Sequence, residues 1–294
     1  MLEALQFIYA PQIINGLSIG VAVILMALGL TIIFGLLDVI NMSHGEFYAA
    51  GAFLGLTLVA IGVPFWVCIA LVPALLFPIG VVTEKLLIQK VFNTKDRHIL
   101  TLLLTFGIAI VLEDLYKIIW GANPSKLDPP ITGAVDLFGV MFPNYRLFLM
   151  IFGALIITAV WLLVYKTPIG SIIRASAHDR HMTASLGIPV TWVHALTFGF
   201  GIALAGLAGV LLAPIYSVFP TMGKDFILMA FSVVIVGGLG SIKGAVVAGI
   251  LLTQLQSISS LYISPVWSDP LVFAVMVVVL MFKPSGLYGG MKNG

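Results

Sequence analysis

Charged residues are scarce in this chain. Only 9% of its 294 residues are Asp, Glu, Lys or Arg, where soluble domains carry about 25%. Hydrophobic residues make up 61%, against roughly 45–50% in soluble domains. So few charges cannot cover a surface that faces water, and a net charge of +2 is too small for a nucleic-acid-binding surface. The long apolar runs therefore predict an all-α polytopic membrane protein in a lipid bilayer.

The chain has a single cysteine and no Lys or Arg near its N-terminus. The single cysteine, Cys68, excludes an intrachain disulfide and a thiolate metal cage. No Lys or Arg precedes Lys85, so the first apolar run lacks the positive start of a secretory signal peptide. We expect the run Ala4–Leu37 to be retained as a membrane span.

The charge-free runs divide into segments long enough to cross a bilayer, which takes about 20 apolar residues. They predict eight to nine helices, at Ile13–Leu37, Gly45–Ile61, Phe65–Thr83, Ile99–Trp120, Arg146–Tyr165, Thr191–Ala213, Phe226–Gly240, Gly244–Ile263 and Val266–Phe282. The segment 226–240 is short for a full pass, so it is expected either to span or to form a broken or tilted half-helix.

The placement of Lys and Arg predicts the orientation, because cytoplasmic loops carry an excess of both. With nine passes and the N-terminus outside, ten of these residues lie inside: Lys85, Lys90, Lys95, Arg97, Lys166, Arg174, Arg180, Lys243, Lys283 and Lys292. Four lie outside: Lys117, Lys126, Arg146 and Lys224. The sequence thus predicts a periplasmic N-terminus and a cytoplasmic C-terminus.

Two hydrophilic segments interrupt the apolar runs. The segment Gly121–Tyr145 is rich in Pro and Gly in its first half, which predicts an external loop without regular structure. The segment Lys166–Pro189 predicts a pair of short helices at the inner membrane surface. Thr167-Pro168 suits a helix start, Asp179 can cap a second helix, and Gly187 can end it.

Small residues recur at a spacing of four inside the predicted spans, in the sets Gly201/Ala205/Gly209, Gly16/Gly20 and Gly51/Gly55. In lipid, small residues at this spacing let helix backbones approach closely. We interpret them as packing positions within the membrane; a homodimer face is the alternative.

The glycine-rich segment Gly237–Gly244 does not have the spacing of a Walker loop or of a dinucleotide-binding turn. It is expected to form a tight turn near the cytoplasmic face, and any ATP chemistry must come from another polypeptide.

The segment Asn41–Glu46 places a His and a Glu between the first two spans. Ionisable groups near membrane helices are costly and usually functional, so proton or substrate handling is one reading. A metal site is another, although zinc takes three or four ligands. In a structural reading, Glu46 caps a helix and His44 bonds to backbone freed at the break.

The remaining polar groups do not form a catalytic arrangement. Glu113 and Lys117 have the spacing of a local ion pair beside Asp114, and His178 with His181 is a weak candidate for a metal. Neither a Ser-His-Asp nor a Cys-His arrangement is visible, so we do not expect an enzyme.

Together these segments resemble one family, the permeases of branched-chain amino acid (leucine/isoleucine/valine-type) ABC importers. The resemblance rests on Phe34-Gly35, Asn41, His44-Gly45-Glu46, Gly51-Ala52, the loop Arg174–Gly187, Gly237-Gly238-Leu239-Gly240-Ser241, Gly244-Ala245 and Lys283-Pro284-Ser285-Gly286-Leu287-Tyr288-Gly289. These stretches follow the family's order from end to end, and the length is similar to that of the first, shorter paralogue of the pair. The family often has an acidic residue where this chain has Ala177 or His178.

The resemblance implies a single transmembrane permease domain, residues 1–294, in a bacterial inner membrane. The implied partners are a second paralogous permease subunit, two cytoplasmic ATPases that bind ATP and Mg, and a periplasmic substrate-binding protein. Segment 166–189 becomes the coupling loop, with Arg174, Ala175, Asp179, Arg180, Leu186 and Gly187 as contacts. Candidates for the translocation path or its helix breaks are Asn41, Ser43, His44, Gly45, Glu46, Gly237, Gly238, Gly240 and Ser241.

Two alternatives stay open. Members of the same family import urea, short amides or small aromatic acids. An ion-coupled secondary transporter would instead use Asp38, Glu46 or Asp225 to carry its ion. The surface helix pair favours the ABC importer, because an ATPase needs a docking element. A passive channel lacks support because no ring of filter residues is recognisable.

Overall fold

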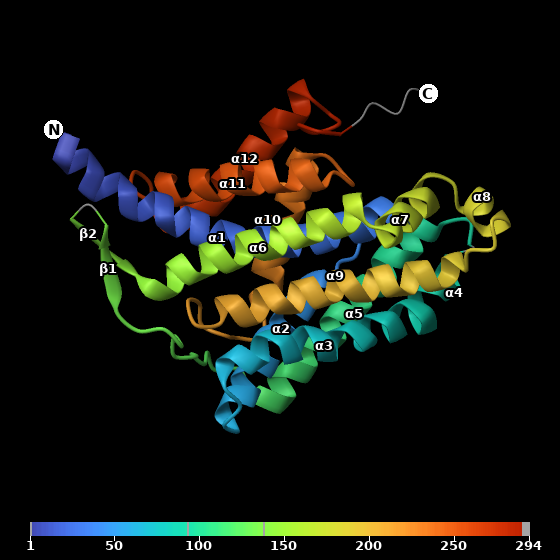
Figure 1. The fold of residues 1–294 in the computed structure, drawn as a ribbon, viewed down its shortest axis with the longest axis horizontal. Helices are drawn as coiled ribbons and strands as arrows, with labels where there is room; N and C mark the ends of the chain where they lie inside the picture. Colours follow the sequence, from blue (N-terminus) through green and yellow to red (C-terminus); the bar gives the residue numbers. More distant parts are fainter. Residues whose placement is uncertain (1, 93, 138, 290–294) are drawn as a thin grey trace.

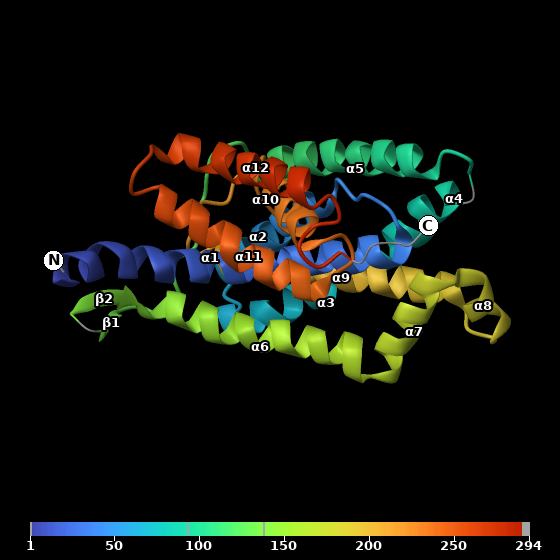
Figure 2. The ribbon, with the colours of Figure 1, turned by 90° about the horizontal axis from the view of Figure 1, so that it is seen from above.

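The helices of this protein run mostly along one long axis (Figure 1). The computed structural model describes residues 2–92, 94–137 and 139–289. The start of the chain and a small β-hairpin lie at one end of the axis. The short helices α4 (Gln89–Val91), α7 (Pro168–His178) and α8 (Arg180–Ser185) lie at the other (Figures 1 and 2). Segments that the sequence predicts on opposite sides of the membrane thus lie at opposite ends of the molecule.

Every predicted span overlaps a described helix. These helices are α1 (Leu2–Leu37), α2 (His44–Ala60), α3 (Phe65–Thr83), α5 (Arg97–Trp120), α6 (Asn144–Lys166), α9 (Val190–Leu212), α10 (Met222–Gly237), α11 (Ile242–Ser259) and α12 (Pro265–Phe282). Six segments of the described chain are long and apolar enough to cross a membrane: Phe7–Leu37, Phe65–Val91, Arg97–Trp120, Asn144–Lys166, Val190–Leu212 and Ile242–Ser259. The chain is therefore an all-α polytopic membrane protein apart from its hairpin.

Helices α2 and α10 are shorter than the other spans, with 17 and 16 residues. At 1.5 Å per residue they reach about 26 and 24 Å, less than the ~30 Å hydrocarbon thickness. Helix α10 begins at Met222, ahead of the predicted run 226–240, because its first turn holds the polar residues Lys224 and Asp225, which the apolar run leaves out. It ends at Gly237 because Gly238 has a φ of 103°, which continues no right-handed helix.

Two segments differ from the prediction. The loop 121–145 is not free of regular structure, because β1 (Ala134–Leu137) pairs antiparallel with β2 (Val140–Pro143). The turn between them is closed by Asp136, whose Oδ1 accepts a hydrogen bond of 2.7 Å from the Gly139 amide. The helix predicted to end at Thr83 continues through a π-helical turn, η1 (Glu84–Ile88), into α4. A π turn adds one residue per turn without breaking the helix, so the charges there do not end it.

The core lies around α1 and α9. Of the apolar windows of these helices, 78% and 83% are buried inside the chain, against 28% for α5 and 22% for α6. Large apolar side chains such as Val111 and Ile118 of α5 are exposed. A helix that faces lipid or another membrane subunit exposes apolar side chains in this way.

Small residues make the closest contacts of this core, as the sequence predicts. A Cβ atom added to Gly51 of α2 would lie 2.2 Å from the carbonyl oxygen of Gly206 in α9. One added to Gly209 would lie 2.0 Å from the carbonyl oxygen of Tyr48. Helices α2 and α9 therefore touch backbone to backbone within one chain, and the packing interpretation is confirmed.

Candidate translocation and coupling sites

The break between α1 and α2 is held by Asn41. Its Oδ1 accepts hydrogen bonds from the Ser43 amide at 3.1 Å and from Ser43 Oγ at 2.7 Å. Asn41, Ser43, His44 and Glu46 are all buried. The polar segment that the sequence singles out thus lies inside the molecule, where backbone groups at a helix end need protein partners.

His44 and Glu46 do not act as the structural reading expects. His44 Nε2 donates to the carbonyl oxygen of Met26 at 3.0 Å, and Met26 lies well inside α1 rather than at the break. No side chain caps the start of α2. Asn41 Nδ2, His44 Nδ1 and Glu46 Oε2 are buried without a hydrogen-bond partner. Unpartnered polar atoms inside a protein are costly, and ending a helix does not by itself account for these three.

Glu46 lies where α2, α5 and α10 meet. A Cβ atom on Gly45 would be 2.2 Å from the carbonyl oxygen of Gly223, at the start of α10, and one on Gly223 would be 2.7 Å from Glu46 Oε1. Tyr116 of α5 donates its hydroxyl to the Glu46 carbonyl oxygen at 2.8 Å. The starts of two short helices therefore meet at this carboxylate.

A second carboxylate joins α5 to α10. Glu113 pairs with Lys117 at 2.8 Å, as its spacing predicts, and also with Lys224 of α10 at 2.5 Å. The second pair is a finding of the structure, because nothing local in the sequence connects positions 113 and 224. It ties the first turn of α10 to α5 close to Glu46.

Hydrogen bonds within the turn and from the C-terminal segment hold the glycine-rich turn between α10 and α11. Ser241 Oγ accepts a hydrogen bond of 3.1 Å from the Gly244 amide and so caps α11. The C-terminal segment packs against the turn. The Leu287 amide donates a hydrogen bond to the Val236 carbonyl oxygen at 2.7 Å, and the Tyr288 amide donates one to the Gly237 carbonyl oxygen at 2.9 Å. The predicted tight turn is confirmed.

Gly35, near the end of α1, also meets this turn. A Cβ atom there would lie 3.2 Å from Gly240 Cα. Three stretches that are far apart in the sequence, at Phe34-Gly35, 237–241 and 283–289, thus meet at one place.

Segment 166–189 forms two short helices with the predicted caps. Thr167 Oγ1 accepts from the Gly170 amide at 3.1 Å, and Asp179 Oδ1 accepts from the Met182 amide at 2.9 Å. Gly187 follows the end of α8 with a φ of 81°. Both caps satisfy amides that a helix start leaves free.

The side chains of this segment include one arginine that contacts α6 and several exposed apolar groups. Arg174 turns back onto α6, where it donates to the Val164 carbonyl oxygen and lies 5.5 Å from the Tyr165 ring. Three apolar side chains are exposed as well: Ile169, Met182 and Leu186. An exposed apolar set on short helices is the usual surface for docking in a groove.

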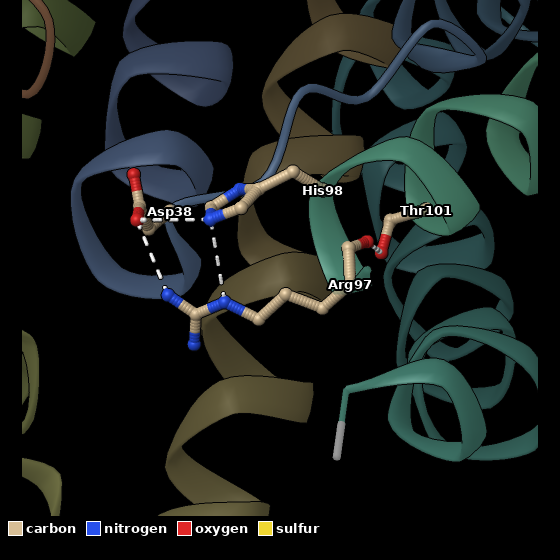
Figure 3. A network of polar contacts seen from close by, with 4 residues as sticks. All are labelled: Asp38, Arg97, His98 and Thr101. Atoms are coloured by element: carbon tan, nitrogen blue, oxygen red, sulfur yellow. Dashed lines mark hydrogen bonds and ion pairs between the residues drawn. The ribbon is translucent and has the colours of Figure 1, made fainter. Parts of the chain in front are cut away.

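The acidic residues of the transporter alternative lie in different surroundings. Asp38, at the end of α1, pairs with Arg97 (Figure 3), Glu46 is buried between three helices, and Asp225 lies in the first turn of α10. Within the described residues, no group of three or more His, Cys, Asp or Glu side chains could hold a metal ion. This holds for His178 with His181 as well.

Comparisons with known proteins agree on one family. The family described as "Branched-chain amino acid transport system / permease component" matches residues 12–280. The chain is 30% identical to the high-affinity branched-chain amino acid transport system permease protein LivH of Escherichia coli (strain K12), over 97% of each chain. It is 28% identical to BraD of Pseudomonas aeruginosa over 96% of each chain. The longer permease protein LivM of Salmonella typhimurium is 26% identical, over 90% of this chain and 67% of its own length. No solved structure matches.

These matches extend over almost the whole chain, including the helix break, the glycine turn and the two short helices. They describe transport permease components rather than enzymes. The existence of both LivH and LivM proteins among them fits a pair of related permease subunits. The chain therefore belongs to the family of permease components of branched-chain amino acid transport systems.

Proposed function

We propose that this protein is the shorter membrane subunit of an ABC importer that carries branched-chain amino acids into the cell. The observation that carries the proposal is the similarity to LivH proteins, 30% identical over 97% of both chains. Those relatives are named for high-affinity branched-chain amino acid transport. Residues 1–294 serve as one permease domain in the inner membrane.

The orientation proposed is a periplasmic N-terminus and a cytoplasmic C-terminus, with up to nine passes. It is supported by the separation of the two ends: the hairpin lies at one and α4, α7 and α8 at the other (Figure 1). Nine of the ten predicted inside Lys and Arg then face the cytoplasm, as the positive-inside rule requires. The tenth, Lys292, lies outside the described residues.

The proposed partners are a LivM-like permease subunit, two ATPases that bind ATP and Mg, and a periplasmic binding protein. The coupling loop 166–189 is proposed to dock in a groove of an ATPase. Its exposed Ile169, Met182 and Leu186 support this role. The caps at Asp179 and Gly187 keep the loop stiff enough to transmit movement, with Arg174, Ala175 and Arg180 beside them.

The proposed path runs past the helix break and the glycine turn. The backbone of the break is buried and that of the glycine turn lines a cavity, the two settings in which a membrane protein tolerates irregular backbone. The unpartnered polar atoms of Asn41, His44 and Glu46 support a moving or substrate-facing role for the break. Gly237, Gly238, Gly240 and Ser241 form the other border of the path.

The test is transport by the complete complex in proteoliposomes. Leucine uptake should require ATP and the binding protein, and it should persist when a proton ionophore is added. Competition by urea, acetamide or benzoate in place of leucine, isoleucine and valine would assign the chain to another substrate of the family. Uptake that needs an ion gradient and no ATPase would instead support a secondary transporter.

A further inference from the structure

A cavity of about 850 Å³ opens at the end of the molecule that carries α7 and α8. Five parts of the chain line it: the end of α1, the link before α5, the helices α7 and α8, the start of α9, and the glycine turn with the C-terminal segment. The cavity therefore touches both the proposed coupling loop and the place where three separated sequence stretches meet.

One wall of the cavity carries an ion pair that is easily opened. Asp38 Oδ2 lies 3.3 Å from Arg97 Nη2 and 3.8 Å from His98 Nε2 (Figure 3). The Arg97 and Asp38 side chains are 36% and 52% exposed, and ion pairs in such surroundings contribute little to stability. Asp38 also has a φ of 52°, in the left-handed region that non-glycine residues seldom adopt. Strained residues of this kind gather at binding sites.

Three nitrogen-bearing side chains, Arg97, Arg180 and His194, gather around the Phe92 ring in the lining of the cavity. The Arg180 guanidinium lies 4.5 Å and that of Arg97 5.4 Å from the centre of the Phe92 ring. The His194 ring lies 5.4 Å from it. Two carboxylates interact with these groups: Asp38 pairs with Arg97, and the buried Glu84 interacts electrostatically with Arg180. Two guanidinium groups beside one ring can together hold a carboxylate.

Two buried polar atoms of the wall lack partners. His194 is 3% exposed and Ser176 is 4% exposed. The His194 Nε2 and Ser176 Oγ atoms have no hydrogen-bond partner, and both residues line the cavity. Both atoms lie behind the cavity surface, where a polar atom without a partner is costly, so a ligand with hydrogen-bonding oxygens reaches them only when the wall rearranges.

We propose that this cavity binds a free α-amino acid that arrives from the cytoplasm. Its carboxylate is held by Arg97 and Arg180, with Ser176 and His194 nearby, and its ammonium group is held by Asp38. The weak Asp38–Arg97 pair is a ready match for a zwitterion, whose opposite charges are one carbon apart. The aliphatic side chain lies against the apolar part of the lining, Phe34, Leu37, Phe92, Ile235 and Leu239. A phosphate or nucleotide fits less well, because Asp38 repels it.

Occupancy would slow the transport cycle. Ser176 and Arg180 belong to the helices of the coupling loop, while Asp38 belongs to the segment that leads into the helix break. An amino acid bound to both sides holds them together in one arrangement. A ligand that binds one state more tightly shifts the population toward it, so the transported product would inhibit its own import. The ligand class and the cytoplasmic direction rest on the proposed function.

The test uses proteoliposomes of the complete complex with the ATPases facing the bath. Binding protein and labelled leucine are enclosed, so ATP and L-leucine added to the bath reach only the cytoplasmic face. Release of labelled leucine into the bath (export from the vesicle) then corresponds to import into a cell. Millimolar L-leucine in the bath should reduce ATP hydrolysis and this export several-fold. Isoamylamine, which lacks the carboxylate, and 4-methylpentanoate, which lacks the ammonium group, should not.

Two variants and one control locate the site. Asp38→Asn, which keeps a side chain suited to left-handed backbone, should raise the half-inhibitory leucine concentration about tenfold. Leu239→Trp should abolish inhibition by filling the cavity. Asp114→Asn, which removes an exposed carboxylate at the other end of α5, should respond as the unmodified chain does.

Four outcomes would overturn the proposals. Export that proceeds unchanged in the presence of bath leucine, or inhibition that Asp38→Asn and Leu239→Trp leave intact, rules out the site. Equal inhibition by 4-methylpentanoate or by inorganic phosphate shows a general anion site and rules out the amino acid. A wild-type complex that exports no leucine with ATP refutes the proposed function itself.

Discussion

Replacing Gly51 by alanine tests the backbone contact between α2 and α9. The new Cβ atom would lie 2.2 Å from the Gly206 carbonyl oxygen and 2.5 Å from Gly206 Cα. Both obstacles are backbone atoms, so no change of side-chain rotamer relieves them. The two helices must separate by about 1 Å at their crossing, in a core packed as densely as an organic crystal.

The size of the effect follows from two opposing contributions. Overpacking costs about 1–3 kcal/mol, and a backbone obstacle places this site near the upper value. Alanine in place of glycine inside a helix gains up to ~1 kcal/mol. The net loss is therefore about 2 kcal/mol, which lowers the folding equilibrium constant by a factor of roughly 30.

The measurement is unfolding of the purified subunit in detergent micelles as the fraction of SDS rises, followed by circular dichroism. Gly107→Ala is the matched control, because no atom lies within 4 Å of the Cβ position there; it should be neutral or slightly stabilising. Gly206→Ala should fall between the two, since its Cβ meets the tip of the flexible Leu76 side chain at 2.1 Å. If Gly51→Ala resists SDS as well as Gly107→Ala does, the close crossing of α2 and α9 is wrong.

Four further predictions concern the site. Gly187→Val places a β-branched residue at a φ of 81°, which strains the backbone of the coupling loop by at least ~1–2 kcal/mol. Both this variant and Arg174→Glu should insert into the membrane normally. Both should lose the stimulation of ATP hydrolysis by substrate. Full stimulation with normal co-purification of the ATPases in both would refute the docking role. Glu46→Gln should impair leucine uptake with assembly intact, and unchanged uptake would make Glu46 dispensable. Glu113→Gln should lower stability by about 1 kcal/mol through loss of the Lys224 pair, with a smaller loss in high salt; equal SDS resistance would contradict this. Calorimetry on the isolated subunit should find no leucine binding tighter than millimolar, because the proposed binding protein supplies the affinity; micromolar binding would contradict it.

The positions of most helices could be predicted because the information is local. The run 65–83 is bounded by Pro64 and by the charges at Glu84 and Lys85, and α3 begins at the predicted residue. The short helices at 168–178 and 180–185 were predictable for the same reason, since Thr167 and Asp179 carry the oxygens that cap a helix start. The hairpin was missed because its four-residue strands give little periodicity against the Pro and Gly before them.

The candidate site could be predicted only as separate pieces. The sequence singled out Asn41–Glu46, the glycine turn and the coupling loop by their polar or glycine-rich composition. It gave no sign that His44 bonds to Met26, or that Lys224 pairs with Glu113. The first contact joins two consecutive helices and the second joins helices far apart in the chain, and no local pattern encodes either pairing.

By itself the sequence determined the solvent of this protein, its helices and its family, because hydropathy, capping and motif order are properties of short stretches. The tertiary structure alone decided which stretches meet. Gly35, Gly240 and the segment 283–289 come together, and both Asp38 and Arg180 line the cavity beside them. These contacts depend on how closely the helices cross. Backbones approach where glycines such as Gly51 and Gly206 face each other, and that pairing is fixed only when the whole chain packs.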